Sequence, residues 1–120
     1  MVMTLAMTDQ LSSGDRSAAC DELFKALSDG TRRALLEYLV KEGEQSVHAL
    51  TAISAVSQPM VSRHLGKLKR ARLVTARRAG RETYYSARVK GLAPVVQWMA
   101  IYGALWSQRF TALEELAEPA

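Results

Sequence analysis

Residues 56–81 read VSQPMVSRHLGKLKRARLVTARRAGR and contain eight Lys or Arg residues but no Asp or Glu. The 120-residue chain has sixteen basic and twelve acidic residues, so the rest of it keeps eight basic residues against all twelve acidic ones. A surface that serves only solubility mixes both signs of charge. The segregation of charge therefore indicates a polyanionic partner.

The first half of this stretch has helical spacing. Val61, Leu65 and Leu68 fall on one face, and the opposite face is polar and basic, with Gln58, Ser62, Arg63, Gly66, Lys69 and Arg70. The second half predicts two strands, 73–78 and 81–86, joined by a turn at Ala79-Gly80. A membrane-surface helix is disfavoured because the apolar stripe is narrow and has no aromatic residue.

Three helices are expected before the basic one. In the first, from Ser17, the apolar residues are Leu23, Phe24 and Leu27. Asp29 or Thr31 caps the second, and Ser46 and Ser57 cap the third and the basic fourth helix. Arg32 and Arg33 stand in the first turn of the second helix, where the helix dipole disfavours cations. Either a nearby phosphate or plain solvation accounts for them.

A short helix, a tight turn and a basic helix make a helix-turn-helix, and the hairpin after it makes a wing. The predicted fold is mainly α with a small β-hairpin, a winged helix-turn-helix in the order α-α-α-α-β-β-α. One domain is expected at this length. It divides into a loose tail over 1–16, a DNA-binding core over 17–91, and one long C-terminal helix within 92–120.

The last helix is apolar on two neighbouring sides, so both sides require burial. One side covers the core, and the other is expected to pack on a second copy of the chain together with the first helix. The predicted dimer interface consists of Leu23, Val95, Trp98, Met99, Tyr102, Trp106 and Phe110. A ligand pocket lined by Trp98, Tyr102 and Trp106 is the alternative.

Three segments resemble the ArsR family of winged helix-turn-helix transcriptional repressors. They are LFKALSDGTRRALLEYL at 23–39, SQPMVSRHLGKLKRARLV at 57–74 and RRAGRETYYSA at 77–87. The last helix is similar to that of a subgroup with a Trp- and Tyr-rich C-terminal helix. The resemblance implies a homodimer that binds an inverted-repeat operator in double-stranded DNA and represses transcription.

The opening turn of a recognition helix points at base edges in the major groove. Gln58 can pair with adenine, and Arg63 can pair with guanine or turn to a phosphate. The resemblance places His64 beside the DNA, and a half-buried ring is the alternative. The expected base-contacting residues are Ser57, Gln58, Pro59, Ser62, Arg63 and His64.

Other basic side chains are expected to position the protein without reading sequence. These phosphate or wing contacts are Lys67, Lys69, Arg70, Arg77, Arg78 and Arg81. Arg78 or Arg81, near the tip of the wing, can instead enter the minor groove. An interaction module that binds another protein through the 57–71 helix would need an acidic or apolar outer face, which this helix lacks.

No metal and no cofactor are expected. Metal sites of the family use a Cys-x-Cys pair near the third helix, or Asp, Glu and His on the last one. Here the third helix reads SVHALTAI, and the last helix has neither His nor Asp. Cys20, His48 and His64 are too few for a tetrahedral zinc site once His64 is assigned to DNA.

Enzymatic activity is not expected, because the sequence has no Ser–His–Asp, paired-carboxylate or Gly-rich phosphate-loop pattern. The single cysteine, Cys20, excludes an internal disulfide and fits a reducing cytoplasm. It is expected to be a packed small residue, and a thiol switch across a dimer is the alternative. A repressor that responds to a small ligand is a further alternative. Residues 92–108 are too polar for a membrane span.

Overall fold

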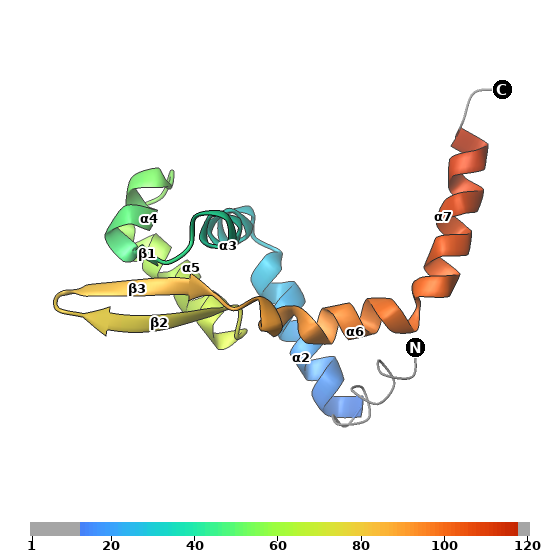
Figure 1. The fold of residues 1–120 in the computed structure, drawn as a ribbon, viewed down its shortest axis with the longest axis horizontal. Helices are drawn as coiled ribbons and strands as arrows, with labels where there is room; N and C mark the ends of the chain where they lie inside the picture. The colour runs from blue at the N-terminus through green and yellow to red at the C-terminus, as the bar shows by residue number, and fades with distance from the viewer. Residues whose placement is uncertain (1–12, 118–120) are drawn as a thin grey trace.

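The structure is a computed structural model that describes residues 13–117, and for 13–17, 104–106 and 117 it describes the backbone alone. Figure 1 shows the helices gathered behind a hairpin that points to one side, while the last helix projects to the other. In chain order the elements are α2 (Ser13–Leu27), α3 (Gly30–Glu42), β1 (Gln45–Ser46), α4 (Val47–Ile53), α5 (Gln58–Arg70), β2 (Val74–Ala79), β3 (Glu82–Ala87), the 3₁₀ helix η1 (Val89–Leu92), α6 (Ala93–Ile101) and α7 (Gly103–Ala117).

The core is aliphatic and lies where α2, α3, α4, α5 and the start of β2 meet. Its largest buried side chains are Leu23, Leu35, Leu39, Leu50, Val61, Leu65, Leu68, Leu73 and Val74. Each such side chain contributes about 1.5–3 kcal/mol on burial. The inward positions predicted for the basic helix, Val61, Leu65 and Leu68, are confirmed.

Side-chain caps fix where the helices of the DNA-binding core begin. The Asp29 carboxylate accepts from the backbone N–H groups of Thr31 and Arg32, so Asp29 is the cap of α3. Ser46 accepts from the Ala49 N–H at the start of α4, and Ser57 accepts from the Met60 N–H at the start of α5. These contacts satisfy N–H groups that have no partner within the helix. The predicted helix-turn-helix is thereby confirmed.

The wing is a β-hairpin with a third, very short strand beside it. The strand order is β1-β3-β2, and both pairs are antiparallel. Ala79 pairs with Glu82, so the turn is Gly80-Arg81, and the prediction of a turn at Ala79-Gly80 is wrong by one residue. Gly80 has φ 63°, and glycine at the first central position is what one type of two-residue turn requires. The sequence did not predict β1.

A compact turn joins α5 to β2. The Leu73 N–H donates to the Leu68 carbonyl and the Arg72 N–H donates to the Lys69 carbonyl, the pattern of a Schellman motif. Arg72 occupies the left-handed position with φ 62°, where glycine is the usual residue. Gly91 packs directly on this turn, because a Cβ built on it would lie 2.0 Å from the Arg72 carbonyl oxygen.

The expected single helix from Leu92 to Glu118 is wrong. It is two helices, α6 and α7, because Tyr102 leaves the helical conformation and the next residue, Gly103, has low helix propensity. At the other end, α2 already begins at Ser13, inside the expected 1–16 tail, and residues 1–12 lie outside the described part. Within residues 13–117, no helix has the length and apolar character needed to cross a membrane.

Candidate nucleic-acid interface

α5 separates its two faces as the sequence predicted. Val61, Leu65 and Leu68 point into the core, whereas the exposed residues are Gln58, Pro59, Ser62, Arg63, Lys67, Lys69 and Arg70. The structure therefore brings five of the six expected base-contacting residues, Ser57 included, to one exposed helix end and outer face. The Ser57 hydroxyl already serves as the helix cap.

The outer face of α5 divides into two rows. At 100° per residue, Gln58, Ser62 and Lys69 share one row. Arg63, Lys67 and Arg70 follow at i, i+4 and i+7 along the other. The second row borders α2, because Lys67 and Arg70 line a cleft together with Glu22 and Lys25. The helix thus carries a mainly polar row and a purely cationic row side by side.

His64 lies on the inner side of α5, in contrast to its expected contact with a base. Its ring is 7% exposed, and Nδ1 lies 3.3 Å from Nη1 of Arg32. Because a guanidinium can only donate, Nδ1 accepts and the ring proton belongs on Nε2. Burial removes His64 from the residues that can reach a base edge, and the residue is more deeply buried than the half-buried ring of the alternative.

Arg32 and Arg33 have a role that the sequence interpretation missed, since both donate hydrogen bonds to backbone carbonyls of α2. Arg32 is 7% exposed and donates from Nε to the Ala26 carbonyl at 2.6 Å and from Nη2 to the Lys25 carbonyl at 3.0 Å. Arg33 donates to the Leu27 carbonyl. Both therefore cap the C-terminus of α2, where carbonyls lack partners and the dipole favours cations.

The wing arginines differ from one another. Arg77 forms a bidentate ion pair with Glu44, at 2.6 and 2.9 Å, and its guanidinium lies 4.7 Å from the centre of the Tyr84 ring. This hydrogen bonding from Arg77 holds the pKa of the Glu44 carboxyl below its usual value. Arg77 is thus held against Glu44 from the middle of the wing, which disfavours its expected phosphate contact. Arg78 and Arg81, nearer the tip, are exposed.

The three side chains considered for a metal or redox role lie apart. The Cys20 thiol is buried and donates to the Pro94 carbonyl, and burial raises its pKa, which favours the unreactive thiol form. His48 is exposed on α4, while His64 is held by Arg32. Over the described residues, no three His, Cys, Asp or Glu side chains come close enough together to hold a metal ion.

An apolar surface lies at the far end from the wing, on α2, α6 and α7. Phe24 and Trp98 meet edge to face at 6.2 Å, and Trp98 lies 5.4 Å from Tyr102 between ring centres. An open groove of about 430 Å³ runs past Phe24, Trp98, Met99 and Phe110.

Leu23 and Trp106 differ from the other members of the predicted dimer interface. Leu23 is only 2% exposed and belongs to the core, so its expected interface role is wrong, and Phe24 is the α2 residue that faces the groove. Helical spacing placed both on one side, which is why the sequence did not separate them. The Trp106 side chain lies outside the described part of the chain.

Known proteins share this arrangement. The family described as "Bacterial regulatory protein, arsR family" matches residues 29–76. The transcriptional repressor SdpR of Bacillus subtilis is 35% identical over 79 residues, covering 66% of this chain and 87% of its own. The HTH-type transcriptional regulator Rv2034 of Mycobacterium tuberculosis is 38% identical over 98 residues, covering 82% of this chain and 88% of its own.

A solved structure extends the likeness to three dimensions. It is the solution structure of a homodimeric winged helix-turn-helix DNA-binding domain from Mycobacterium bovis, with a TM-score of 0.57 and 31% identity. The match covers 77% of this chain and 90% of that one. The basic helix, the wing and these relatives agree, and the chain belongs to the ArsR family of winged helix-turn-helix, DNA-binding transcription regulators.

Proposed function

We propose that the chain is a homodimeric repressor that binds an inverted-repeat operator and does not respond to metal ions. The observation that carries the proposal is the outer face of α5, where exposed polar and basic residues are unmixed with acidic ones from Gln58 to Arg70. A helix with this face, capped by Ser57 at its start, has the properties of a recognition helix in a major groove.

The two rows of α5 divide the contacts. Gln58 and Ser62, near the N-terminus of the helix, are assigned to base edges, with Ser57 and Pro59 completing the opening turn. Arg63 stands on the cationic row, which favours a phosphate over guanine. Lys67, Lys69 and Arg70 are assigned to phosphates, and Arg78 and Arg81 to the backbone or minor groove beside the wing.

A second copy of the chain is proposed to cover the apolar surface of α2, α6 and α7. Trp98, Met99, Tyr102 and Phe110 are between 39% and 57% exposed in one protomer, a large apolar area for a protein surface. A related domain is described as homodimeric. A two-fold dimer presents its recognition helices to half-sites about one helical turn apart, which calls for an inverted repeat.

Metal independence rests on the donor set. Cys20 is buried with a raised thiol pKa, and the distance of His48 and His64 from it leaves no site with several ligands among the described residues. Equimolar zinc, cadmium or arsenite is therefore expected to leave DNA affinity unchanged. Tight one-to-one metal binding that releases DNA would overturn this part of the proposal.

The division of contacts is tested by binding over a salt series on the promoter DNA of the gene and on scrambled DNA. Gln58→Ala should cost about 1–3 kcal/mol on the promoter DNA and relax one base preference. Arg81→Ala should weaken both DNAs and flatten the salt dependence by about one unit. Arg109→Ala removes an exposed cation from α7 and is the charge-matched control. It should change binding to neither the promoter DNA nor the scrambled DNA. If neither Gln58→Ala nor Arg81→Ala alters binding, α5 and the wing are not the DNA interface.

A further inference from the structure

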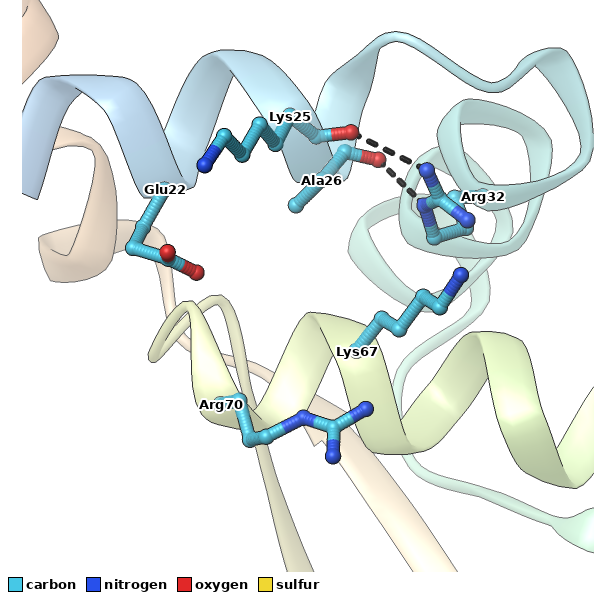
Figure 2. Close-up of a pocket in the computed structure, with 6 residues that line it drawn as sticks. All are labelled: Glu22, Lys25, Ala26, Arg32, Lys67 and Arg70. Carbon is cyan, nitrogen blue, oxygen red and sulfur yellow. Dashed lines mark hydrogen bonds between the residues drawn. The ribbon is translucent and has the colours of Figure 1, made fainter.

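A second basic feature lies beside α5, in a cleft of about 270 Å³ between α2, α3 and α5. Its lining is Glu22, Lys25, Ala26, Arg32, Lys67 and Arg70. Figure 2 shows Lys67 and Arg70 rising from α5 on one side, with α2 across the cleft and Arg32 at one end. The Lys67 ammonium extends toward Arg32, while the Glu22 carboxylate lies at the opposite end.

The cleft has a large excess of positive charge. Four cationic side chains share it with one carboxylate. Across the described residues, the sole ion pair is that between Arg77 and Glu44, so Glu22 neutralises none of the four at ion-pair distance. Cations that converge without a counter-charge repel one another, and an anion between them relieves that repulsion.

Arg32 marks one end of the cleft. Its guanidinium is buried, its hydrogen bonds go to two backbone carbonyls and to Nδ1 of His64, and its charge helps to lower the pKa of the nearby Asp29 carboxyl. Carbonyls at a helix C-terminus supply only about half a negative charge. The Asp29 carboxylate balances part of the Arg32 charge, whereas Lys67 and Arg70 form no ion pair among the described residues.

The basic surface also continues past the cleft. An adjoining depression of about 450 Å³ shares Glu22 and Arg70 with it and adds Arg72, Arg88 and Lys90. In the other direction the cationic row of α5 leads from Lys67 to Arg63 on the outer face. A track of this kind suits a chain of phosphates better than a single small ion.

We propose that the cleft between α2 and α5 binds a phosphate group, which the DNA backbone supplies next to the half-site that α5 reads. Lys67 and Arg70 donate to it directly, Arg70 through the planar fork that matches two phosphate oxygens. Lys25 brings α2 into the nucleic-acid interface. The inference rests on the proposed function and adds to it a contact from a helix outside the helix-turn-helix.

The test uses the full chain and a mixed-sequence DNA duplex, because a phosphate contact needs no operator. Lys25→Gln and Lys67→Gln are each expected to lower the slope of log affinity against log salt by about one unit. Lys41→Gln, an exposed cation in the last turn of α3, is the matched control and should leave the slope unchanged. Arg32 is left intact because it holds α2.

A second arm identifies the source of the phosphate. Pyrophosphate is titrated at constant ionic strength into the DNA complexes of the wild type and of Lys67→Gln, to measure how well it competes with the DNA. If the DNA backbone is the source, pyrophosphate competes no better than chloride at equal ionic strength. The DNA assignment is overturned by two results together. Pyrophosphate competes with DNA for the wild type but not for Lys67→Gln, and Lys25→Gln leaves the slope of log affinity against log salt unchanged. The cleft is then assigned to a free phosphate compound.

The inference fails altogether if neither variant changes the slope and pyrophosphate acts alike on the wild type and Lys67→Gln. Its failure remains distinguishable from failure of the proposed function. If only the cleft inference fails, Gln58→Ala and Arg81→Ala still weaken DNA binding. If the proposed function fails, they do not.

Discussion

The DNA-binding core and the C-terminal helices of this chain bury their apolar residues in opposite ways. In the core, large side chains such as Leu50, Leu65 and Leu68 are 0% exposed. In α6 no residue is fully buried, and Met99 remains 57% exposed. The core therefore completes its packing within one chain, while α6 and α7 have an apolar surface that a single protomer leaves uncovered.

The cause lies in the pattern of the residues. α3 and α5 each have one apolar face and one polar face, so packing on one side is enough to bury their apolar residues. Residues 92–106 have apolar residues on two sides. Among the described side chains of this segment, Leu92 and Val95 are the ones that pack against the core. Mutations in the core are consequently expected to change folding, and mutations in the C-terminal helices to change assembly.

The largest expected effect is that of Gly91→Ala, in η1, which joins the two regions. The added Cβ would lie 2.0 Å from the Arg72 carbonyl oxygen, and that backbone is fixed by the Schellman motif. We expect a loss of more than about 4 kcal/mol in the free energy of unfolding, or no folded protein. Gly66→Ala, a helical glycine with open space around it, should instead stabilise by about 0.5–1 kcal/mol. Denaturant unfolding of both variants checks this.

Arg32→Met should be the next most damaging change. It leaves the Ala26 carbonyl and the His64 Nδ1 without their donor and removes one donor from the Lys25 carbonyl, which keeps its hydrogen bonds from Ser28, at a cost of roughly 2–4 kcal/mol. Arg33→Met removes one exposed hydrogen bond and should cost about 0.5 kcal/mol. Equal unfolding midpoints for the two variants would contradict the structural role of Arg32.

Trp98→Ala should separate assembly from folding. A large aromatic side chain contributes about 1.5–3 kcal/mol when fully buried, and 39% of Trp98 is left for a partner to cover, so the dissociation constant of the dimer should rise roughly 3- to 10-fold. Ile53→Ala removes a side chain of similar exposure from α4 and should leave the dimer unchanged. Sedimentation over a range of concentrations measures both. A 13.2 kDa monomer at micromolar concentration in the wild type would refute the dimer itself.

The smallest effect is expected in the middle of the wing. The Arg77 hydrogen bonds hold the Glu44 pKa below its unfolded value, so the pair stabilises the fold above the usual pKa of glutamate and is lost as pH falls through the lowered value. Glu44→Gln should therefore lower the unfolding temperature slightly at neutral pH and match the wild type in strong acid. In an Arg77→Gln background the same change should have a much smaller pH-dependent effect, because only the Ser86 hydrogen bond to Glu44 remains. If the unfolding temperatures of Glu44→Gln and the wild type differ by the same amount at neutral pH and in strong acid, this prediction is contradicted.

The core was predictable from local signals. The caps Ser46 and Ser57 and the inward positions of α5 follow from side-chain chemistry and helical spacing, and they are confirmed. The strands of the wing were predictable in kind, whereas their register was not. Either Ala79-Gly80 or Gly80-Arg81 can form a two-residue turn around one glycine, and only the pairing of the strands decides between them.

Other features depend on contacts between distant residues, which no local pattern reveals. Arg32 and Arg33 cap a helix that ends before them, and a cation just after a helix end was the available signal. The two-residue β1 is too short for any periodicity. The break at Tyr102 had one local indication, Gly103, but a glycine within an apolar helix does not by itself end it.

Arg32 has a further consequence, for communication through the protein. Its guanidinium joins the end of α2, which packs on α6, to the middle of α5 through His64. A ligand or partner that displaces α2 relative to α5 must act against these hydrogen bonds. The free energy that couples the two ends is by thermodynamic necessity the same in both directions. An effector at the apolar surface could therefore regulate DNA binding without approaching the DNA, and Arg32 would be the first residue at which to measure that coupling.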